Sequence, residues 1–281
     1  MEIGLSTNGG KLIEAELFEN YSKSGIKFME ISLPQEDYMT FDYKNAKKLA
    51  DEYGISLWSF HLPFKPFNTM DISSLDNELR KNSVACTAEL IKKAADIGID
   101  KYVIHCGGLV NRNNPHEVRE RISYAKESYA LLAEYAAREG GTVLVENLPP
   151  VSAGTNIEEI DELVSADERL GICFDTNHLL DGNHVEFINH FGTRIISTHI
   201  SDYDLIKERH WLPGEGNLDW KMLYKALRDA GYTGPWLYEV AFVNLPTINR
   251  GRDLICEDFA RNAHEIFENR EFTIIPSVKN V

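Results

Sequence analysis

The chain has 281 residues, 43% of them hydrophobic, which is enough to build a sizeable buried core. Its formal net charge of −15 disfavours nucleic acid as a partner, because surfaces that bind phosphate backbones gather lysine and arginine. No window reaches the roughly 18 consecutive apolar residues of a membrane helix, and the N-terminal sequence MEIGLSTNGG lacks a basic and then apolar leader, so we expect a cytoplasmic protein without a membrane partner.

Short β-branched or aromatic runs alternate with amphipathic stretches along the whole chain. The intervening stretches, such as 75–98 and 116–140, carry apolar residues at helical spacing and end at glycine. The runs predict eight strands, at residues 2–6, 27–33, 55–62, 101–107, 142–148, 171–175, 194–201 and 235–240.

This alternation indicates one domain over residues 1–281. Eight strand–helix units spread over roughly 250 residues fit an α/β fold of the closed (β/α)8 type, the TIM barrel, better than an open sheet. We see no linker rich in proline, glycine or serine and no shift in composition. Neither a GxGxxG motif nor a Walker loop follows any strand, which argues against a Rossmann-type domain.

Polar side chains with the capacity to bind a metal recur at the ends of the predicted strands. In a TIM barrel these ends meet at one mouth, where the reactive groups of such folds lie. Every strand end from the third to the eighth supplies at least one, and the second strand contains a glutamate. These residues are Glu30, His61, His105, Glu146, Asp175, His178, His199, Asp202 and Glu239.

The glutamates within apolar runs carry more weight than the histidines. A single histidine at a strand end is more often a hydrogen-bonded structural residue than a ligand, whereas a carboxylate in a run such as VLVEN or WLYEV needs a partner. Two carboxylates about 4 Å apart repel each other by roughly 4 kcal/mol at an effective dielectric of about 20. Glu146, Asp175 and Glu239 therefore call for a cation, and a divalent metal with His199 as a further ligand suits these donors.

Five segments, VENLP, FDTNH, THISD, KERHWLPGEGNLDW and YEV, make the chain similar to the xylose isomerase-like barrel superfamily. This superfamily includes sugar isomerases and epimerases, inosose-type dehydratases and endonuclease IV-type DNA repair enzymes. In its ketose 3-epimerase branch a Glu, an Asp, a His and a second Glu hold the metal, and they match Glu146, Asp175, His199 and Glu239. The resemblance implies that the two glutamates also form the acid–base pair and that His178 contacts substrate oxygens.

The activity that the resemblance implies is a divalent-metal-dependent isomerase or epimerase of a sugar, sugar phosphate or cyclitol. Such an enzyme removes a proton next to a carbonyl and passes through an enediolate. Mn2+, Mg2+ or Co2+ is the expected metal, with Zn2+ as the alternative. Trp211 and Arg209, in the polar loop after the seventh strand, are further candidates for substrate contacts. Members of the superfamily often associate, which leaves a homo-oligomer open.

A trinuclear zinc phosphodiesterase of the endonuclease IV type is the main alternative. The acidic balance and the loop RHWLPGEGNLDW favour the sugar-processing branch, and ERH at 208–210 stands where the repair enzymes have Asp-Arg-His. Inosose-type dehydration and a non-catalytic binding protein with a structural metal site also stay open. The residues that match the three-zinc ligand set are His61, His105, Glu146, Asp175, His178, His199, Glu208, His210 and Glu239.

Overall fold

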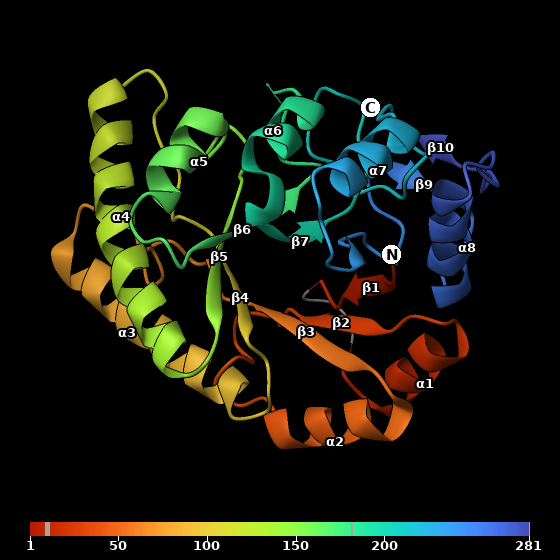
Figure 1. Ribbon diagram of the computed structural model, residues 1–281, viewed down its shortest axis with the longest axis horizontal. Helices are drawn as coiled ribbons and strands as arrows, with labels where there is room; N and C mark the ends of the chain where they lie inside the picture. The colour runs from red at the N-terminus through yellow and green to blue at the C-terminus, as the bar shows by residue number, and fades with distance from the viewer. Residues whose placement is uncertain (9–11, 181, 281) are drawn as a thin grey trace.

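Eight parallel strands form the centre of the structure, a computed structural model that describes residues 1–8, 12–180 and 182–280 (Figure 1). The sheet order is β7-β6-β5-β4-β3-β2-β1-β8, and an isolated bridge between Ile200 and Tyr238 links the end of β7 to β8. This nearly closed barrel confirms the predicted TIM fold. The strands are β1 (Ile3–Ser6), β2 (Phe28–Ile31), β3 (Ser56–His61), β4 (Lys101–Ile104), β5 (Thr142–Glu146), β6 (Gly171–Asp175), β7 (Ile195–His199) and β8 (Trp236–Tyr238).

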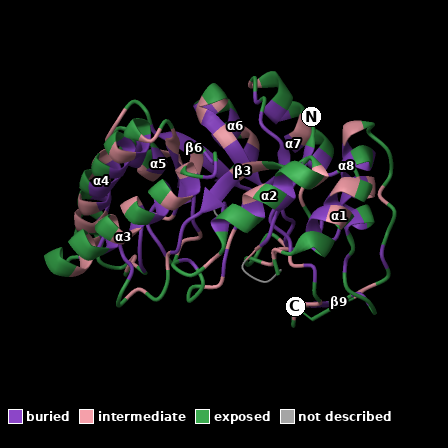
Figure 2. Cartoon of the chain, turned by 90° about the horizontal axis from the view of Figure 1, so that it is seen from below, coloured by how far each residue is buried: buried purple, intermediate pink, exposed green. Residues whose placement is uncertain are grey.

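Helices surround the barrel, with their buried faces against the sheet and their exposed faces outward (Figure 2). None of the helices within the described ranges is long and apolar enough to cross a membrane. Two short strands, β9 (Ile248–Asn249) and β10 (Val278–Lys279), pair antiparallel outside the barrel. The helices are α1 (Ala15–Lys23), α2 (Tyr43–Tyr53), α3 (Asn77–Ala95), α4 (Pro115–Arg138), α5 (Ile157–Val164), α6 (His184–Phe191), α7 (Trp220–Asp229) and α8 (Cys256–Phe267), with a short 3-10 helix at Gly192–Arg194.

Side-chain caps fix the points at which the loops of the barrel mouth enter the following helices. In α3, for example, Asp76 accepts hydrogen bonds from the backbone N–H groups of Glu78 and Leu79. Each such cap stabilises its helix by about 1 kcal/mol. The capping residues of α2 to α7 are Asp42, Asp76, Asn114, Asn156, Asn183 and Asp219.

The inward-facing side chains of the strands form an apolar layer inside the barrel and a polar layer at its mouth. Val103, Leu144 and Cys173 form a small buried cluster of their own. Because successive side chains of a strand point to opposite faces, the residue two positions further on points the same way. For Leu144 and Cys173 those residues are Glu146 and Asp175, which therefore face the barrel axis one layer nearer the mouth.

Candidate active site

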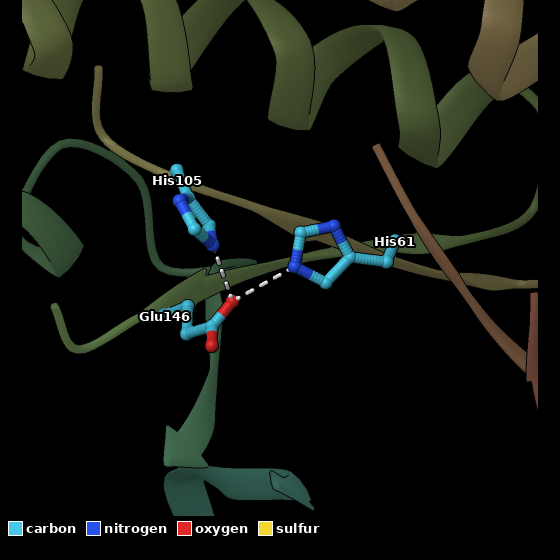
Figure 3. Close-up of side chains that lie close together, drawn as sticks. All are labelled: His61, His105 and Glu146. Carbon is cyan, nitrogen blue, oxygen red and sulfur yellow. Dashed lines mark ion pairs between the residues drawn. The ribbon is translucent and has the colours of Figure 1, made fainter. Parts of the chain in front are cut away.

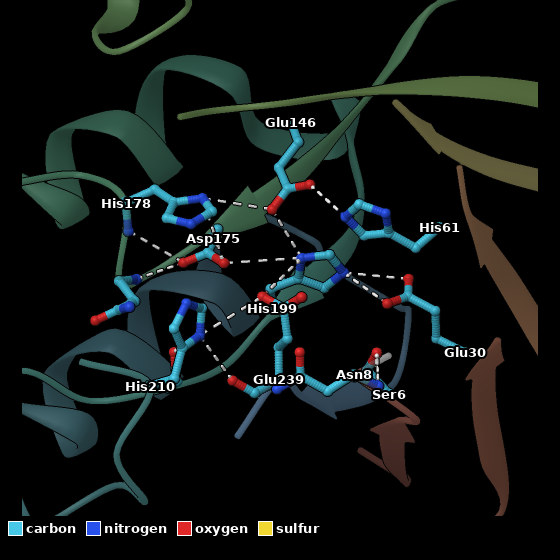
Figure 4. Close-up of polar contacts among 12 residues, drawn as sticks. Ser6, Asn8, Glu30, His61, Glu146, Asp175, His178, His199, His210 and Glu239 are labelled. Carbon is cyan, nitrogen blue, oxygen red and sulfur yellow. Dashed lines mark hydrogen bonds and ion pairs between the residues drawn. The ribbon is translucent and has the colours of Figure 1, made fainter. Parts of the chain in front are cut away.

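Four side chains from the last four strands converge at the mouth of the barrel (Figure 4). Glu146, Asp175 and His199 end β5, β6 and β7, and Glu239 directly follows β8. One ligand atom of each lies within 4.8 Å of the others, and all four residues are buried. Nδ1 of His199 is 2.9 Å from Oε1 of Glu146, 3.5 Å from Oε2 of Glu239 and 3.7 Å from Oδ2 of Asp175. We call these four residues the central group.

The chemistry of the central group fits a divalent metal. Oε2 of Glu146 and Oδ2 of Asp175 are buried oxygens without a well-directed hydrogen bond among the described residues. An acceptor left in this state costs about 1–3 kcal/mol, and more when it is charged. Three carboxylates and one imidazole supply the oxygen and nitrogen ligands that Mg2+, Mn2+, Co2+ and Zn2+ accept. A bound cation would satisfy these oxygens and offset the repulsion among the carboxylates.

The two glutamates of the central group differ in their affinity for a proton. Burial alone would raise the pKa of Glu146, but the imidazoles of His199 and His105 outweigh it and hold this pKa well below its usual range. Burial raises the pKa of Glu239 to about 7, against the opposing effects of His199 and His210. Two carboxyl groups whose pKa values are pushed apart in this way are typical of an acid–base pair.

A second set of donors consists of His61, His105 and Glu146 and shares Glu146 with the central group (Figure 3). We call it the inner group. Oε2 of Glu146 lies 3.0 Å from Nε2 of His105 and 3.3 Å from Nε2 of His61. Phe64 stacks on His105 with 4.0 Å between the ring centroids. Burial lowers the pKa of His105 to about 4, although Glu146 opposes this shift. This shift favours the neutral imidazole, the form of histidine that binds a metal.

A third set, the loop group, consists of His178, Glu208 and His210. Oε1 of Glu208 is 2.8 Å from Nε2 of His210 and 3.7 Å from Nε2 of His178. Nδ1 of His178 lies 3.0 Å from the carbonyl oxygen of Asn147, and Nδ1 of His210 lies 3.1 Å from that of Glu239. These backbone contacts tie the loop group to the central group, because Asn147 follows Glu146 directly.

A cavity of about 600 Å3 opens above these groups. It is lined by the two histidines of the inner group, by the loop group and by Glu239. Its outer wall is largely apolar, with Phe64, Phe67, Leu109 and Val151. Lys65 is the one lysine or arginine among the described lining residues. Such a volume suits a small organic molecule.

The model of the xylose isomerase-like TIM barrel family matches residues 18–258 of this chain. The protein belongs to this family. Its sequence is 28% identical over 202 residues to an uncharacterized protein of Methanocaldococcus jannaschii, in a match that covers 68% of this chain and 67% of that protein. It is also 26% identical over 207 residues to a probable endonuclease 4 of Sulfurihydrogenibium sp., a match that covers 71% of this chain and 68% of the relative.

Solved structures of sugar epimerases share the barrel. A D-tagatose 3-epimerase-like protein superposes with a TM-score of 0.77 and 22% identity over 96% of both chains. A 3-keto-D-glucoside 4-epimerase from E. coli superposes with a TM-score of 0.76 and 17% identity, over 95% of this chain and 99% of that one. At these identities the likeness shows a common fold.

In this family member, Asp202 organises the loop that carries Glu208 and His210. Its buried carboxylate accepts hydrogen bonds from the backbone N–H groups of residues 203, 214 and 218 and from the indole of Trp220. Gly216 packs against it so closely that a Cβ there would lie 2.2 Å from Oδ1 of Asp202. The segment THISD at the end of β7 and the segment PGEG further along the chain therefore meet at the carboxylate of Asp202.

Trp211 and Arg209 lie outside the cavity lining. The Trp211 side chain is buried, and its indole N–H donates to Oγ1 of Thr247 at 3.1 Å. The guanidinium of Arg209 donates to Oδ2 of Asp204, with Nε at 2.8 Å. The backbone of Trp211 pairs with that of Asp202, and the side chains of Trp211 and Arg209 stabilise the loop without lining the cavity.

Asn147 is a site residue that the strand-end pattern misses. Its side chain donates to the carbonyl oxygen of Asp175 and accepts from the backbone N–H of the same residue, at 2.9 and 2.8 Å. Asn147 thus joins the end of β5 to the end of β6 and fixes the spacing between Glu146 and Asp175. Its position directly after Glu146, in a buried run, is the only signal of this role in the sequence.

Proposed function

We propose that this protein is a divalent-metal-dependent isomerase or epimerase that acts on a sugar or cyclitol at a carbon next to a carbonyl. The observation that carries the proposal is the placement of two glutamates of the central group at the inner end of a small cavity. Glu239, directly after β8, lines the cavity, and Glu146, at the end of β5, lies beneath it. A divalent ion held by the central group would polarise the carbonyl and stabilise the charge of an enediolate.

The chain's own residues have distinct tasks in this reaction. Glu239 lines the cavity, and Glu146 lies beneath it with its carboxylate between His199 and His105. One of the two glutamates takes the carbon-bound proton, and the same or the other carboxyl group returns a proton to the neighbouring atom or to the opposite face. His178 and His105 also line the cavity, where their ring nitrogens can contact substrate hydroxyl groups.

The surroundings of the site support a small polyhydroxy substrate. Polar side chains from the first two strand–helix loops, including Asn8, Ser32 and Gln35, line the cavity on one side. Lys65 is the one lysine or arginine among the described lining residues, and together with a net charge of −15 this gives little attraction for a polyanion. Solved structures with the same fold include a D-tagatose 3-epimerase-like protein and a 3-keto-D-glucoside 4-epimerase.

A panel of ketoses, aldoses and cyclitol ketones tests this proposal. Each compound is incubated with protein loaded with Mn2+, Mg2+ or Co2+, and the products are separated by chromatography. We expect one isomer or epimer of one compound to form only in the presence of the metal. A panel without any new isomer, together with release of water from a cyclitol ketone, would replace isomerisation by inosose-type dehydration, which starts with the same proton transfer.

A second candidate function, a zinc phosphodiesterase, rests on the inner and loop groups. With the central group they form three adjacent donor sets that share Glu146 or adjoin it, enough for more than one metal ion. The two relatives named as probable endonuclease 4 support this candidate function. Cleavage of an abasic-site oligonucleotide by zinc-loaded protein, with about three zinc ions per chain by elemental analysis, would favour this candidate.

A further inference from the structure

Glu30 on β2 lies directly against the central group without reaching the cavity (Figure 4). Its side chain is fully buried. Nε2 of His199 is 3.0 Å from Oε1 and 3.1 Å from Oε2 of Glu30. The hydroxyl of Ser59 donates to Oε2 at 2.7 Å. His199 and Ser59 are thus the hydrogen-bonding neighbours of this carboxylate, and no lysine or arginine of the described chain pairs with it.

The two ring nitrogens of His199 face different partners. Nδ1 faces the carboxylates of Glu146, Asp175 and Glu239, and Nε2 faces Glu30. An imidazole binds a metal through an unprotonated nitrogen, and the hydrogen bond made by the other nitrogen decides which one that is. Glu146 and Glu30 can both only accept, at Nδ1 and at Nε2 respectively. A divalent ion that takes the lone pair of Nδ1 leaves the proton of a neutral His199 on Nε2, where Glu30 accepts it.

Neighbouring side chains hold this arrangement rigid. The ring of His61 stacks on that of His199, with centroids 5.7 Å apart and planes inclined by 15°. Ser59 is paired with Glu30 in the register of β2 and β3, at a point where that register shifts by one residue. The irregularity places Ser59, two residues before His61, where its hydroxyl reaches Glu30. Strand register and stacking therefore aim the imidazole before any ion binds.

We infer that Glu30 is a positioning residue that fixes the Nε2–H tautomer and the orientation of His199 for a divalent ion at the central group. The inference rests on the metal-binding part of the proposed function and applies whichever reaction the metal serves. A buried carboxylate is costly to keep unless it serves a partner. Here that partner is a ligand histidine, and outer contacts of this kind strengthen metal binding by about 10- to 100-fold.

Metal affinity tests this role without an activity assay. The dissociation constant for Co2+ is measured by competition with a chromogenic chelator for the wild-type chain, Glu30→Gln and Glu30→Ala. Asp258→Asn serves as the matched control, because Asp258 is a buried carboxylate on α8 that pairs with Arg252 and Arg261, away from the site. We expect both Glu30 variants to bind Co2+ at least 10-fold more weakly and the control to bind it as the wild type does.

Other results overturn the inference. A loss smaller than 10-fold in both Glu30 variants, with normal wild-type binding, removes Glu30 from the metal site and leaves the proposed function standing. Failure of the wild-type chain to bind Co2+, Mn2+ or Zn2+ overturns both.

A measurement on the wild-type protein keeps the inference testable even if the Glu30 variants do not fold. Nitrogen-15 NMR of the zinc-loaded chain should show His199 protonated at Nε2, with the resonance assigned by its absence in His199→Gln. Protonation at Nδ1 would contradict the proposed tautomer.

Discussion

Oε1 of Glu146 lies 2.9 Å from Nδ1 of His199, although 53 positions separate the two residues in the chain. Strand register creates this contact. β6 lies between β5 and β7. Its residue Cys173 is paired with Glu146 of β5, and its residue Asp175 is paired with His199 of β7. The alternation of side chains then turns Glu146, Asp175 and His199 toward the same axis. The backbone of the barrel therefore sets the geometry of the central group, and substitutions there should spare the fold.

Glu146→Gln and Glu239→Gln should each slow proton transfer by at least about 100-fold, because glutamine cannot exchange a proton in place of a carboxyl group. Chromatography of the product formed from the active compound of the panel measures the loss, and circular dichroism checks the fold. Glu134→Gln, at an exposed position on α4, is the matched control and should keep the wild-type rate. A variant of either site glutamate with the wild-type rate would remove that residue from the acid–base pair.

Removal of a bound divalent metal should lower the free energy of unfolding. An ion that binds only the native state stabilises it by about 2.7 kcal/mol at a concentration of 100 times its Kd. Thermal denaturation after dialysis against EDTA, and again after addition of Mn2+, measures this effect. Asp175→Asn should respond much less to Mn2+, since one ligand of the central group has lost its charge. Equal melting temperatures with and without metal would speak against a site in the native protein.

Asp202→Ala should loosen the loop that carries Glu208 and His210. Four hydrogen bonds end on the buried Asp202 carboxylate, and donors left unsatisfied cost about 1–3 kcal/mol each. Hydrogen exchange followed by mass spectrometry should show faster exchange in residues 203–218 and unchanged exchange in β5 and β6. Gly216→Ala should act in the same direction, because its Cβ would collide with Asp202. Unchanged hydrogen exchange of residues 203–218 in both variants would show that other contacts hold the loop in place.

The ion pairs of Asp258 should stabilise α8 at neutral pH and lose their effect in acid. Burial alone would raise the pKa of Asp258, but Arg252 outweighs it and lowers this pKa to about 2 from the usual 3.8. A depressed carboxyl pKa contributes stability above pH 3.8 that is lost as the pH falls toward 2. Urea denaturation should therefore show Asp258→Asn to be less stable than the wild type at pH 7, with a gap that narrows below pH 4. A difference in stability between Asp258→Asn and the wild type that did not change with pH would show that the ionisation of Asp258 does not contribute to it.

The sequence predicts the barrel and the layer of side chains at its mouth, because both depend on local patterns. Apolar runs of the right length locate the strands, and the polar residue that ends each run must lie at the mouth of a parallel barrel. The prediction places Glu146, Asp175, His199 and Glu239 in one layer, and the structure brings their ligand atoms within 4.8 Å. Their role as metal ligands stays a prediction for the measurements above.

Local sequence patterns do not predict contacts between elements that are distant in the chain. Glu30 and His199 are 169 residues apart, and the register shift between β2 and β3 is what pairs Glu30 with Ser59. Trp211 stands in a polar loop, where an aromatic side chain suggests a substrate contact, yet its indole turns inward to Thr247. The path of a long loop is set by tertiary partners such as Asp202, which local sequence does not specify.

Solvent deuterium exchange tests the central claim, metal-dependent proton transfer by Glu146 and Glu239, most directly. The active ketose or cyclitol ketone is incubated in D2O with the metal-loaded protein, and deuterium at the carbon next to the carbonyl is measured by mass spectrometry. We predict incorporation that requires the metal and disappears in Glu146→Gln and Glu239→Gln. Incorporation that persists in both variants, or its absence in a metal-loaded protein that cleaves abasic DNA, would contradict the account.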